Sequence, residues 1–492
     1  MRATFRQSGK PCFSWVLLTA LLVLLLSCWT TGGLAATEEE IITNERLDAF
    51  IDHATSYLVR ISHTKEQDPQ HPGAFTYIAV LGEELQLRGF DERPQRDYNL
   101  LRHNGAIYAL AQAYDRKPSE AVKEAMLRGI EYLKGEVGPV PNPDGSMIPN
   151  LLAPWELATF GDTKPNPHKR AKLGGAGLGL IALCNVERLV PGTIELDYMR
   201  QIGNFIQFLQ NHDGSFSSRY STKNGKDRSW TSLYYPGEAA LGLVYLYEIE
   251  SDEVYQKKWL SIATETLLYL ERLRRNQAVE KLEPDHWALL ATARLLPKLD
   301  KDSVEYWLVY NHAIKVIHNM VSEVSDAALK EHNGCFTMDR RTCPTSTRLE
   351  GLINSLSFVK DYEVFIDEEA HKVVPLRQKM RHHIELGVSF LLQSQQQTHH
   401  HNMKGAVPVA YPVQAEEDEE VRVDYVQHSM SAIIAYEEHV AHHHPPSRFL
   451  ATILEAEGLD VALLVVAFFF LTSLVLLVLP FTAKKKSLRY SE

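Results

Sequence analysis

Apolar residues follow two different helical patterns along this chain. Segments such as Asn44–Ser62, Glu253–Arg275 and Glu368–Gln397 have apolar side chains at helical spacing on one face and charged side chains on the other. Shorter segments between them, such as Gly174–Val190 and Tyr235–Tyr247, are rich in Ala, Gly and Leu and have no polar face. This alternation predicts an all-α protein of about twelve helices in six pairs, each with one amphipathic and one fully buried member.

The links between these helices alternate in length. The link from a buried helix to the next amphipathic one is brief, as at Pro191-Gly192-Thr193, whereas the link back is long and polar. A repeat with this asymmetry closes into a ring, with the buried helices around the centre and the amphipathic helices outside. All long loops then lie on one face, at the N-terminal ends of the inner helices. An open solenoid is the competing geometry, but six pairs match a closed ring.

A local motif carries a resemblance to known proteins. Gln210–Phe216, QNHDGSF, resembles the helix-ending Q-x-x-D-G-[SG]-[FW] signature of (α/α)6 toroids, which include six-hairpin glycosidases, the C-terminal domain of D-glucuronyl C5-epimerases and terpenoid cyclase barrels. Tyr235–Leu241 resembles the inner-helix openings of the carbohydrate-active branch. The resemblance spans roughly Ile41–Val440 and implies an (α/α)6 toroid, a fold that supports many chemistries.

Two branches of that fold are disfavoured by the sequence. Terpenoid cyclases use D-x-D-D or D-D-x-x-D clusters, which this chain lacks, and Cys184 is badly placed for the zinc triad of protein prenyltransferases. The carbohydrate-active branch therefore remains as the expectation.

Side chains able to do chemistry stand at the predicted starts of the inner helices, which would converge on one mouth. Acid–base work on a sugar needs carboxylates, imidazoles and phenols in one concave space. The preferred acid–base carriers are Glu238, Asp285 and Glu350, with Tyr235 and His286 as their partners. Each also has a structural interpretation, because acids in the first turn cap helices and histidines occur in cores.

Further residues near the same helix starts are candidates for substrate binding. Helix N-termini and cations favour an anionic or hydroxylated ligand, and aromatic side chains favour a sugar platform. The arginines have internal ion pairs, with Glu350 or Glu238, as an equal alternative. The predicted binding residues are Arg102, His103, Trp155, Glu156, Trp230, Arg348, Asp424 and His428.

Both ends of the chain carry membrane-targeting signals. Residues 1–36 have a basic start, an apolar run and small residues before Ala36, which predicts a secretory signal peptide. An uncleaved anchor helix is the alternative, and Leu25-Leu26-Ser27-Cys28 loosely resembles a lipobox. Val461–Phe481 is apolar and long enough to span a bilayer, and the basic residues 482–492 follow it. Basic flanks stay cytoplasmic, so the domain at 41–445 is expected on the outer side.

Net charge and cysteine spacing limit which binding partners and metal sites are expected. The chain carries −11, and setting aside the leader and the tail, which carry +3 each, leaves −17. Such a surface argues against a nucleic-acid partner. Cys335 and Cys343 bracket a short loop and are a candidate disulfide in an oxidising compartment. The cysteine spacing predicts no metal site, and no cofactor is expected.

These features lead to two hypotheses of function. The first is a membrane-anchored, extracytoplasmic enzyme acting on an envelope or extracellular polysaccharide, with its reaction class open among hydrolase, epimerase and lyase. The second is a non-catalytic binding or assembly subunit of an envelope complex. Ion pairs that join Glu238 and Glu350 to Arg102 or Arg348 would favour the second.

Overall fold

A computed structural model describes most of the chain between the two predicted membrane-targeting segments. The described residues are 42–83, 98–157, 169–227, 229–324, 326–367, 371–395 and 401–441, all within the unit that begins at Ile42. The predicted leader, residues 1–36, and the predicted span, Val461–Phe481, lie outside them. Across the described ranges, no helix has the length and apolar composition needed to cross a bilayer.

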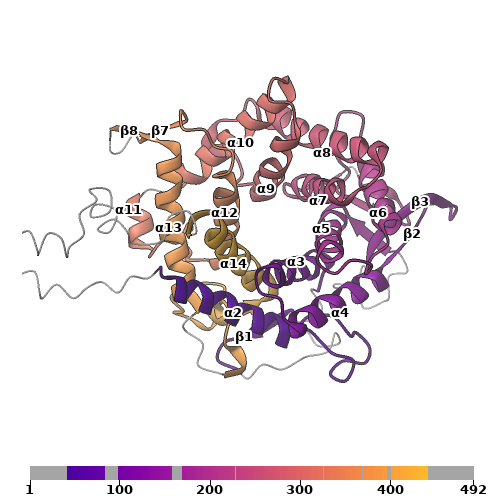
Figure 1. The fold of residues 1–492 in the computed structure, drawn as a ribbon, viewed down its shortest axis with the longest axis horizontal. Helices are drawn as coiled ribbons and strands as arrows, with labels where there is room; N and C mark the ends of the chain where they lie inside the picture. Colours follow the sequence, from indigo (N-terminus) through magenta and orange to yellow (C-terminus); the bar gives the residue numbers. More distant parts are fainter. Residues whose placement is uncertain are drawn as a thin grey trace, which may run out of the picture. The chain divides into compact units, whose positions relative to one another are not determined.

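Six buried helices surround the centre of this unit (Figure 1). Each packs against its neighbour along the chain, and the last packs against the first, which closes the ring. The predicted closed ring is therefore confirmed. The inner helices are α3 (Leu100–Arg116), α5 (Leu173–Leu189), α7 (Tyr235–Ile249), α9 (His286–Leu295), α12 (Thr342–Ser355) and α14 (Val423–Tyr436).

Six amphipathic helices lie outside the inner ring, as their charged faces require. Side-chain caps begin several of them, because Ser119 and Ser303 each accept a hydrogen bond from a backbone N–H three residues on. The outer helices are α2 (Asn44–Arg60), α4 (Glu120–Glu136), α6 (Leu196–Leu209), α8 (Glu253–Arg274), α10 (Val304–Ser322) and α13 (Leu376–Ser394).

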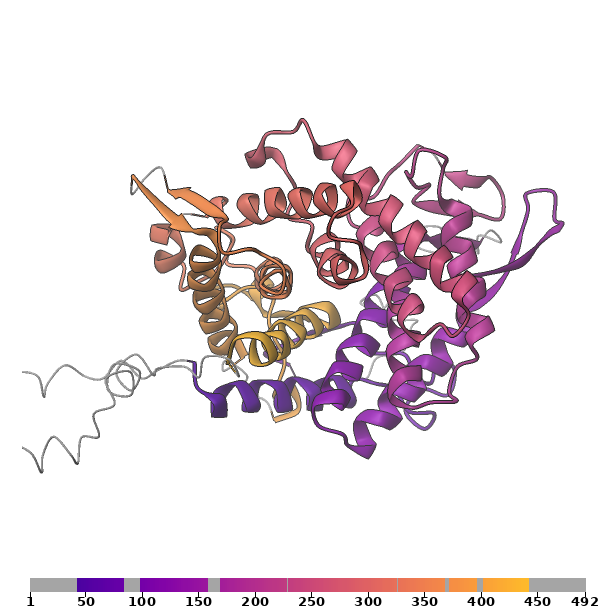
Figure 2. The same ribbon diagram turned by 45° about the horizontal axis from the view of Figure 1, so that its top comes forward.

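The expectation of an all-α fold missed the strands in the long loops. A five-stranded antiparallel sheet of order β2-β3-β4-β5-β6 covers one side of the ring, and Figure 2 shows its β2–β3 hairpin projecting from the helices. In the described ranges a short thirteenth α-helix, α11 (Asp326–Glu331), lies in another loop. The strands of this sheet are β2 (Val137–Pro141), β3 (Met147–Leu157), β4 (Lys169–Lys172), β5 (Arg219–Ser221) and β6 (Gly225–Asp227).

Two further strand pairs correct or complete the sequence prediction. The hairpin of β7 (Val364–Asp367) and β8 (Lys372–Pro375) delays the start of α13, which was expected near Glu368. Strand β1 (Ile78–Val80) pairs with β9 (Glu420–Arg422), immediately before α14. This pairing joins the first long loop to the last inner helix and places both at the same end of the ring.

Glycines allow the inner helices to touch through their backbones. A Cβ added at Gly177 of α5 would meet the Glu238 carbonyl oxygen at 2.6 Å, and one added at Gly242 of α7 would meet the Gly177 carbonyl oxygen at 2.5 Å. Real Cβ atoms do not approach so closely, so the two helices need glycine here. The glycine-rich start of α5 therefore serves helix packing.

The QNHDGSF motif forms a tight turn after α6. Ser215 donates from its backbone N–H and its hydroxyl to Asp213 Oδ1, at 3.0 and 2.6 Å, and Gly214 has φ +82°. Arg272 of α8 donates to the Asp213 carbonyl oxygen at 2.7 Å. The acid of this motif is thus an architectural residue that ties a loop to an outer helix.

Candidate active site

A cavity of about 440 Å³ opens at the N-terminal ends of the inner helices, and we call it the mouth cavity. Every inner helix contributes to its wall, because six helix starts converge there. This confirms that the helix starts share one concave space. The predicted site residues that line it are Arg102, Tyr235, Glu238, His286, Arg348, Asp424 and His428.

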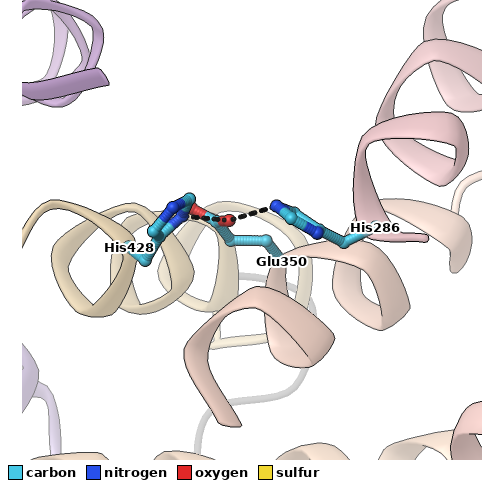
Figure 3. Close-up of side chains that lie close together, drawn as sticks. All are labelled: His286, Glu350 and His428. Carbon is cyan, nitrogen blue, oxygen red and sulfur yellow. Dashed lines mark hydrogen bonds and ion pairs between the residues drawn. The ribbon is translucent and has the colours of Figure 1, made fainter. Parts of the chain in front are cut away.

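One carboxylate stands between two imidazoles beneath this cavity (Figure 3). His428 of α14 donates from Nδ1–H to Glu350 Oε2 of α12 at 2.9 Å. The same oxygen lies 3.9 Å from Nε2 of His286, on α9. All three side chains are buried, and the two imidazole centroids are 5.6 Å apart with nearly perpendicular rings. Both imidazoles are therefore adjacent on one wall of the cavity.

The two histidines have opposite pKa shifts. Burial lowers the pKa of His286 well below its ordinary value, and the charges of His428 and Arg348 act in the same direction. Burial alone would lower the pKa of His428 too, but the charge and hydrogen bond of Glu350 outweigh it and raise that pKa. His286 is thus a neutral base while His428 holds its proton more firmly, a pattern typical of a paired base and acid.

The same three side chains could meet a metal ion by distance alone. One donor atom from each lies within 4.8 Å of the others. The interaction that the structure shows within the group is the hydrogen bond of His428 Nδ1 to Glu350 Oε2 at 2.9 Å, whereas His286 Nε2 makes no hydrogen bond among the described residues. We therefore interpret the group as a hydrogen-bonded pair of His428 and Glu350 with the His286 imidazole beside it.

Glu238 is a buried carboxyl group in the first turn of α7, and it also lines the mouth cavity. Its Oε2 makes no hydrogen bond among the described residues. Burial, together with the charge of Asp285, raises the pKa of Glu238 to about 8. The group is therefore mainly a neutral carboxylic acid at pH 7, able to donate a proton to a ligand.

Asp424, one turn before His428 on α14, binds two arginines. It accepts from Arg102 Nε at 2.8 Å, and from Arg422 Nε and Nη2 at 2.6 and 3.0 Å. Burial would raise the pKa of Asp424, but the two guanidinium groups outweigh it and lower that pKa. Two positive charges on one carboxylate leave a net positive charge at this point of the mouth.

The remaining cations of the mouth have partners behind the wall. Arg348 makes a bidentate pair with Glu323 at 2.7 to 3.0 Å, and Lys172 pairs with Glu156 at 2.6 Å. Among the described residues, neither Arg102 nor Arg348 is paired with Glu238 or Glu350. The ion pairs that would have favoured a non-catalytic subunit are thus replaced by others.

Two predicted site residues have structural roles instead. Asp285 is fully buried, pairs with Arg274 at 2.8 Å and caps α9 by accepting from Ala288 N–H at 3.1 Å. His103 points away from the mouth, and its Nε2 lies 2.9 Å from the Gly129 carbonyl oxygen. Neither lines the mouth cavity. The catalytic assignment of Asp285 and the binding assignment of His103 are therefore withdrawn.

Neither of the two predicted tryptophans lines the mouth cavity. Trp155 is buried in the sheet, where its indole N–H donates to the Gly138 carbonyl oxygen at 3.2 Å, so it cannot stack on a ligand. Trp230 is 37% exposed and meets Tyr235 edge-to-face, with the Arg219 guanidinium 3.9 Å from its ring centroid. Trp287, which is outside the predicted binding set, lines the mouth cavity itself.

The expected disulfide is not formed. Cys335 and Cys343 are both free thiols. Cys335 Sγ lies 3.2 Å from Thr345 Oγ1, whereas Cys343 lines the mouth cavity. Their spacing in sequence allowed a bridge, but the backbone sends the two side chains to different surroundings.

Arg422 and Lys172 are mouth residues that sequence reasoning left out of the binding set. Each ends a short strand just before an inner helix, at Arg422 in β9 and Lys172 in β4. A basic residue immediately before a buried helix is the sequence signal that could have identified both.

Comparisons with known proteins agree with this architecture. A scan against protein-family models and a search of curated proteins each found no match. Solved structures do match, including a D-mannose isomerase (13% identity, TM-score 0.54) and the cellobiose 2-epimerase from Bacillus thermoamylovorans (14%, 0.55), each over 81% of this chain and 99% of the other.

An unsaturated glucuronyl hydrolase specific for heparin matches with 11% identity and a TM-score of 0.50, over 80% of this chain and 98% of that one. At such identities the likeness concerns the fold. The chain therefore has the (α/α)6 toroid fold.

Proposed function

We propose that the protein is a sugar isomerase or epimerase that moves a proton at a carbon beside a carbonyl group. The observation that carries this proposal is the pair His286 and His428, which line one cavity beside a shared carboxylate and have opposite pKa shifts. A toroid of the same fold is named as a D-mannose isomerase and another as a cellobiose 2-epimerase, which supports this reaction class.

The proposed reaction needs only these side chains. Neutral His286 takes the proton from C2 of an open-chain aldose, the C–H electron pair forms the C1=C2 bond, and the carbonyl oxygen takes a proton from His428. In the second half, His286 returns its proton to C1 while His428 accepts the O2 hydroxyl proton, which yields the ketose. Return of the proton to the opposite face of C2 would yield the epimer.

The spacing of the two imidazoles favours isomerisation to the ketose over epimerisation. With centroids 5.6 Å apart, the rings leave no room for a sugar between them, so a substrate lies against both from the cavity side. Base and acid then act on the same face of the substrate. Transfer from C2 to C1 on one face is isomerisation, whereas inversion requires a proton donor on the other face.

The charges of the mouth indicate a substrate with an anionic group. Its lining includes Arg102, Lys172, Arg348 and Arg422, against the ionised Asp424 and the largely neutral Glu238. Six helix N-termini add their positive dipole ends. A sugar carrying a carboxylate, such as a hexuronate, suits this field better than a neutral sugar.

A glycoside hydrolase is the second candidate. Glu238, neutral at pH 7 and without a hydrogen-bond partner among the described residues, has the protonation state of a general acid. Hydrolysis also needs a carboxylate base or nucleophile. Asp424 is held between two arginines and Glu350 is bonded to His428, so neither is as free to act as the histidine pair.

The proposal also includes the setting of the enzyme. The apolar segment Val461–Phe481 would anchor it, with the toroid on the extracytoplasmic side and residues 482–492 in the cytoplasm. Protease treatment of intact cells should remove an epitope tag placed at Ile42 and spare one placed after Glu492. The reverse pattern would reject this orientation.

The reaction is tested by carbon-bound hydrogen exchange. The full-length protein in detergent is incubated in D2O with neutral aldoses, cellobiose and hexuronates, and ¹H NMR follows the C2 proton and the ketose signals. We expect deuterium at C2 and ketose formation for at least one sugar, with loss of both in His286→Asn and His428→Asn. Release of reducing ends without exchange would instead support the hydrolase, and exchange undiminished in both variants would reject the isomerase.

A further inference from the structure

A second cavity, the rear cavity, lies at the other end of the ring. It has a volume of about 340 Å³ and is lined by residues near the C-terminal ends of the inner helices, including Tyr108, Asn185, Arg294 and Ala435. A water molecule in the liquid occupies about 30 Å³ and needs two or more polar partners. Because the wall mixes hydroxyl, amide and charged groups, the rear cavity can hold hydrogen-bonded water.

Glu350 is the contact between the two cavities. Its carboxylate binds His428 Nδ1–H at 2.9 Å and lies 3.9 Å from His286 Nε2, and both histidines line the mouth cavity. Glu350 itself lines the rear cavity. A proton on this carboxylate can therefore pass to the histidines on one side and to water on the other.

A hydroxyl group beside Glu350 is held in place from the rear. Ser431 lies three residues after His428 on α14, and its hydroxyl donates to Gln112 Oε1 of α3 at 2.6 Å. Burial raises the pKa of Glu350, and the neighbouring Ser431 hydroxyl is one of the groups that oppose this shift. Both Ser431 and Gln112 line the rear cavity.

We propose that the rear cavity is the route by which Glu350, and through it His428 and His286, exchanges protons with solvent, and that Ser431 is a positioning residue of this route. The functional meaning of this route rests on the proposed function: while a sugar fills the mouth cavity, the proton that His286 holds between the two half-reactions can exchange with solvent only from another side. No atom other than the proton moves: water in the rear cavity gives a proton to the carboxylate or accepts one from it.

The route is tested first without any substrate. In full-length protein with ¹⁵N-labelled histidine, NMR measures the exchange of the His428 Nδ1 proton with water. Ala435→Leu fills the rear cavity without changing a polar group, and Ala293→Leu is a second filling variant should the first fail to fold. We expect several-fold slower exchange in the filled variants and a changed exchange rate in Ser431→Ala.

Ser429→Ala is the matched control, because Ser429 lies on the same helix but its hydroxyl meets Ser346 at 2.8 Å, away from the rear cavity. Its exchange rate should equal that of the wild type. Equal rates in the wild type and both filled variants would overturn the proposal. So would slower exchange in Ser429→Ala than in Ala435→Leu.

Turnover gives an independent second measurement. With a sugar deuterated at the reacting carbon, the filled variants should retain a larger fraction of deuterium in the product than the wild type, because fewer protons reach Glu350 from the rear. If the filled variants turn over normally and retain the same fraction of deuterium as the wild type, the proton route is overturned but the proposed function is not. Absence of turnover with every sugar would reject the proposed function, while the NMR exchange rates would still decide the route.

Discussion

The carboxylate of Glu350 accepts a hydrogen bond from Nδ1 of His428 at 2.9 Å, and both side chains are buried. A buried carboxylate at this distance stabilises the imidazolium form, which is why the pKa of His428 is raised despite its burial. The nitrogen that faces the carboxylate is also fixed by it, so the proposed acid would act through Nε2, which lies 3.2 Å from Gln427 Nε2. This pair therefore sets both the charge and the orientation of the proposed acid.

Removal of the Glu350 charge should impair the proposed acid. Glu350→Gln keeps an oxygen that can accept from His428, but the pKa of His428 should fall, as measured by ¹⁵N NMR titration. We expect kcat near neutral pH to fall by roughly 10²-fold or more, the usual contribution of a general acid or base. Glu253→Gln, on the exposed face of α8, should change neither quantity. A lowered pKa of His428 with full activity would exclude His428 as the acid.

Neutralisation of Glu238 should raise stability at alkaline pH. The pKa of Glu238 is about 8 when folded and near 4.5 when unfolded, so below pH 4.5 both states hold the proton. As the pH rises from 4.5 to 8 the unfolded chain releases its proton first, and the free energy of unfolding falls by about 1.4 kcal/mol per unit. Glu238→Gln removes this loss, so its Tm should exceed that of the wild type at pH 8 and approach it at pH 5.

The activity of the same variant separates the two candidate reactions. A glutamine can replace a neutral carboxylic acid as a hydrogen-bond donor but cannot release a proton. An isomerase that uses the histidine pair should keep most of its turnover at pH 7 in Glu238→Gln. A hydrolase with Glu238 as its general acid should lose it, which reducing-sugar release would reveal.

The fold was largely predictable because the apolar pattern of each helix indicates whether it lies inside or outside the ring. An amphipathic helix must cover something and a helix apolar on all sides must be covered, so six alternating pairs leave few arrangements other than a closed ring. Brief and long links then placed the polar loops at one end. The short strands were missed because β4, β5 and β6 are three or four residues long and contain Lys, Arg, Ser and Asp, which carry no strand pattern.

The sequence indicated which helix turns form the site, but not which residues of each turn face the cavity. Successive positions on a helix point about 100° apart, at 3.6 residues per turn. Arg102 therefore lines the mouth while His103 is buried against α4, and His286 lines it while Asp285 binds Arg274. Which neighbour faces inward depends on the phase at which each loop enters its helix. Ion-pair partners such as Glu323 depend on packing between distant segments.

The Asp285–Arg274 pair should contribute to stability instead of catalysis. Both side chains are almost fully buried and their closest atoms are 2.8 Å apart. Removal of one partner from such a pair leaves an uncompensated charge and costs about 3–5 kcal/mol. We expect Asp285→Asn to lower the free energy of unfolding by this order in urea titrations. Folded Asp285→Asn protein with wild-type stability and no turnover would restore the catalytic assignment.

Buried neutral histidines should make the toroid acid-sensitive. Burial lowers the pKa of His312 to about 3, and the charges of Arg274 and Lys315 add to this effect. Below pH 6.5 this histidine binds a proton in the unfolded chain but stays neutral in the folded chain. Its contribution to stability is therefore complete above pH 6.5. As the pH drops below that value, the free energy of unfolding falls by about 1.4 kcal/mol per pH unit for this group. His312→Gln should therefore lose less stability than the wild type between pH 6.5 and 4.5. Parallel losses in urea titrations would contradict the assigned pKa.

An anionic substrate should depend on Arg422 in a way that a neutral one does not. Arg422→Gln leaves Asp424 paired with Arg102 at 2.8 Å and so removes the net positive charge from that wall without orphaning the carboxylate. We expect the Kd of a hexuronate to rise about tenfold, which corresponds to about 1.4 kcal/mol, while the Kd of a matched neutral hexose stays constant. Calorimetric titrations at low and high salt provide the measurement, because screening should weaken hexuronate binding in the wild type more than in the variant. Equal losses for both sugars would indicate a structural effect of the substitution, and an unchanged hexuronate affinity would show that the anionic group binds elsewhere in the mouth cavity.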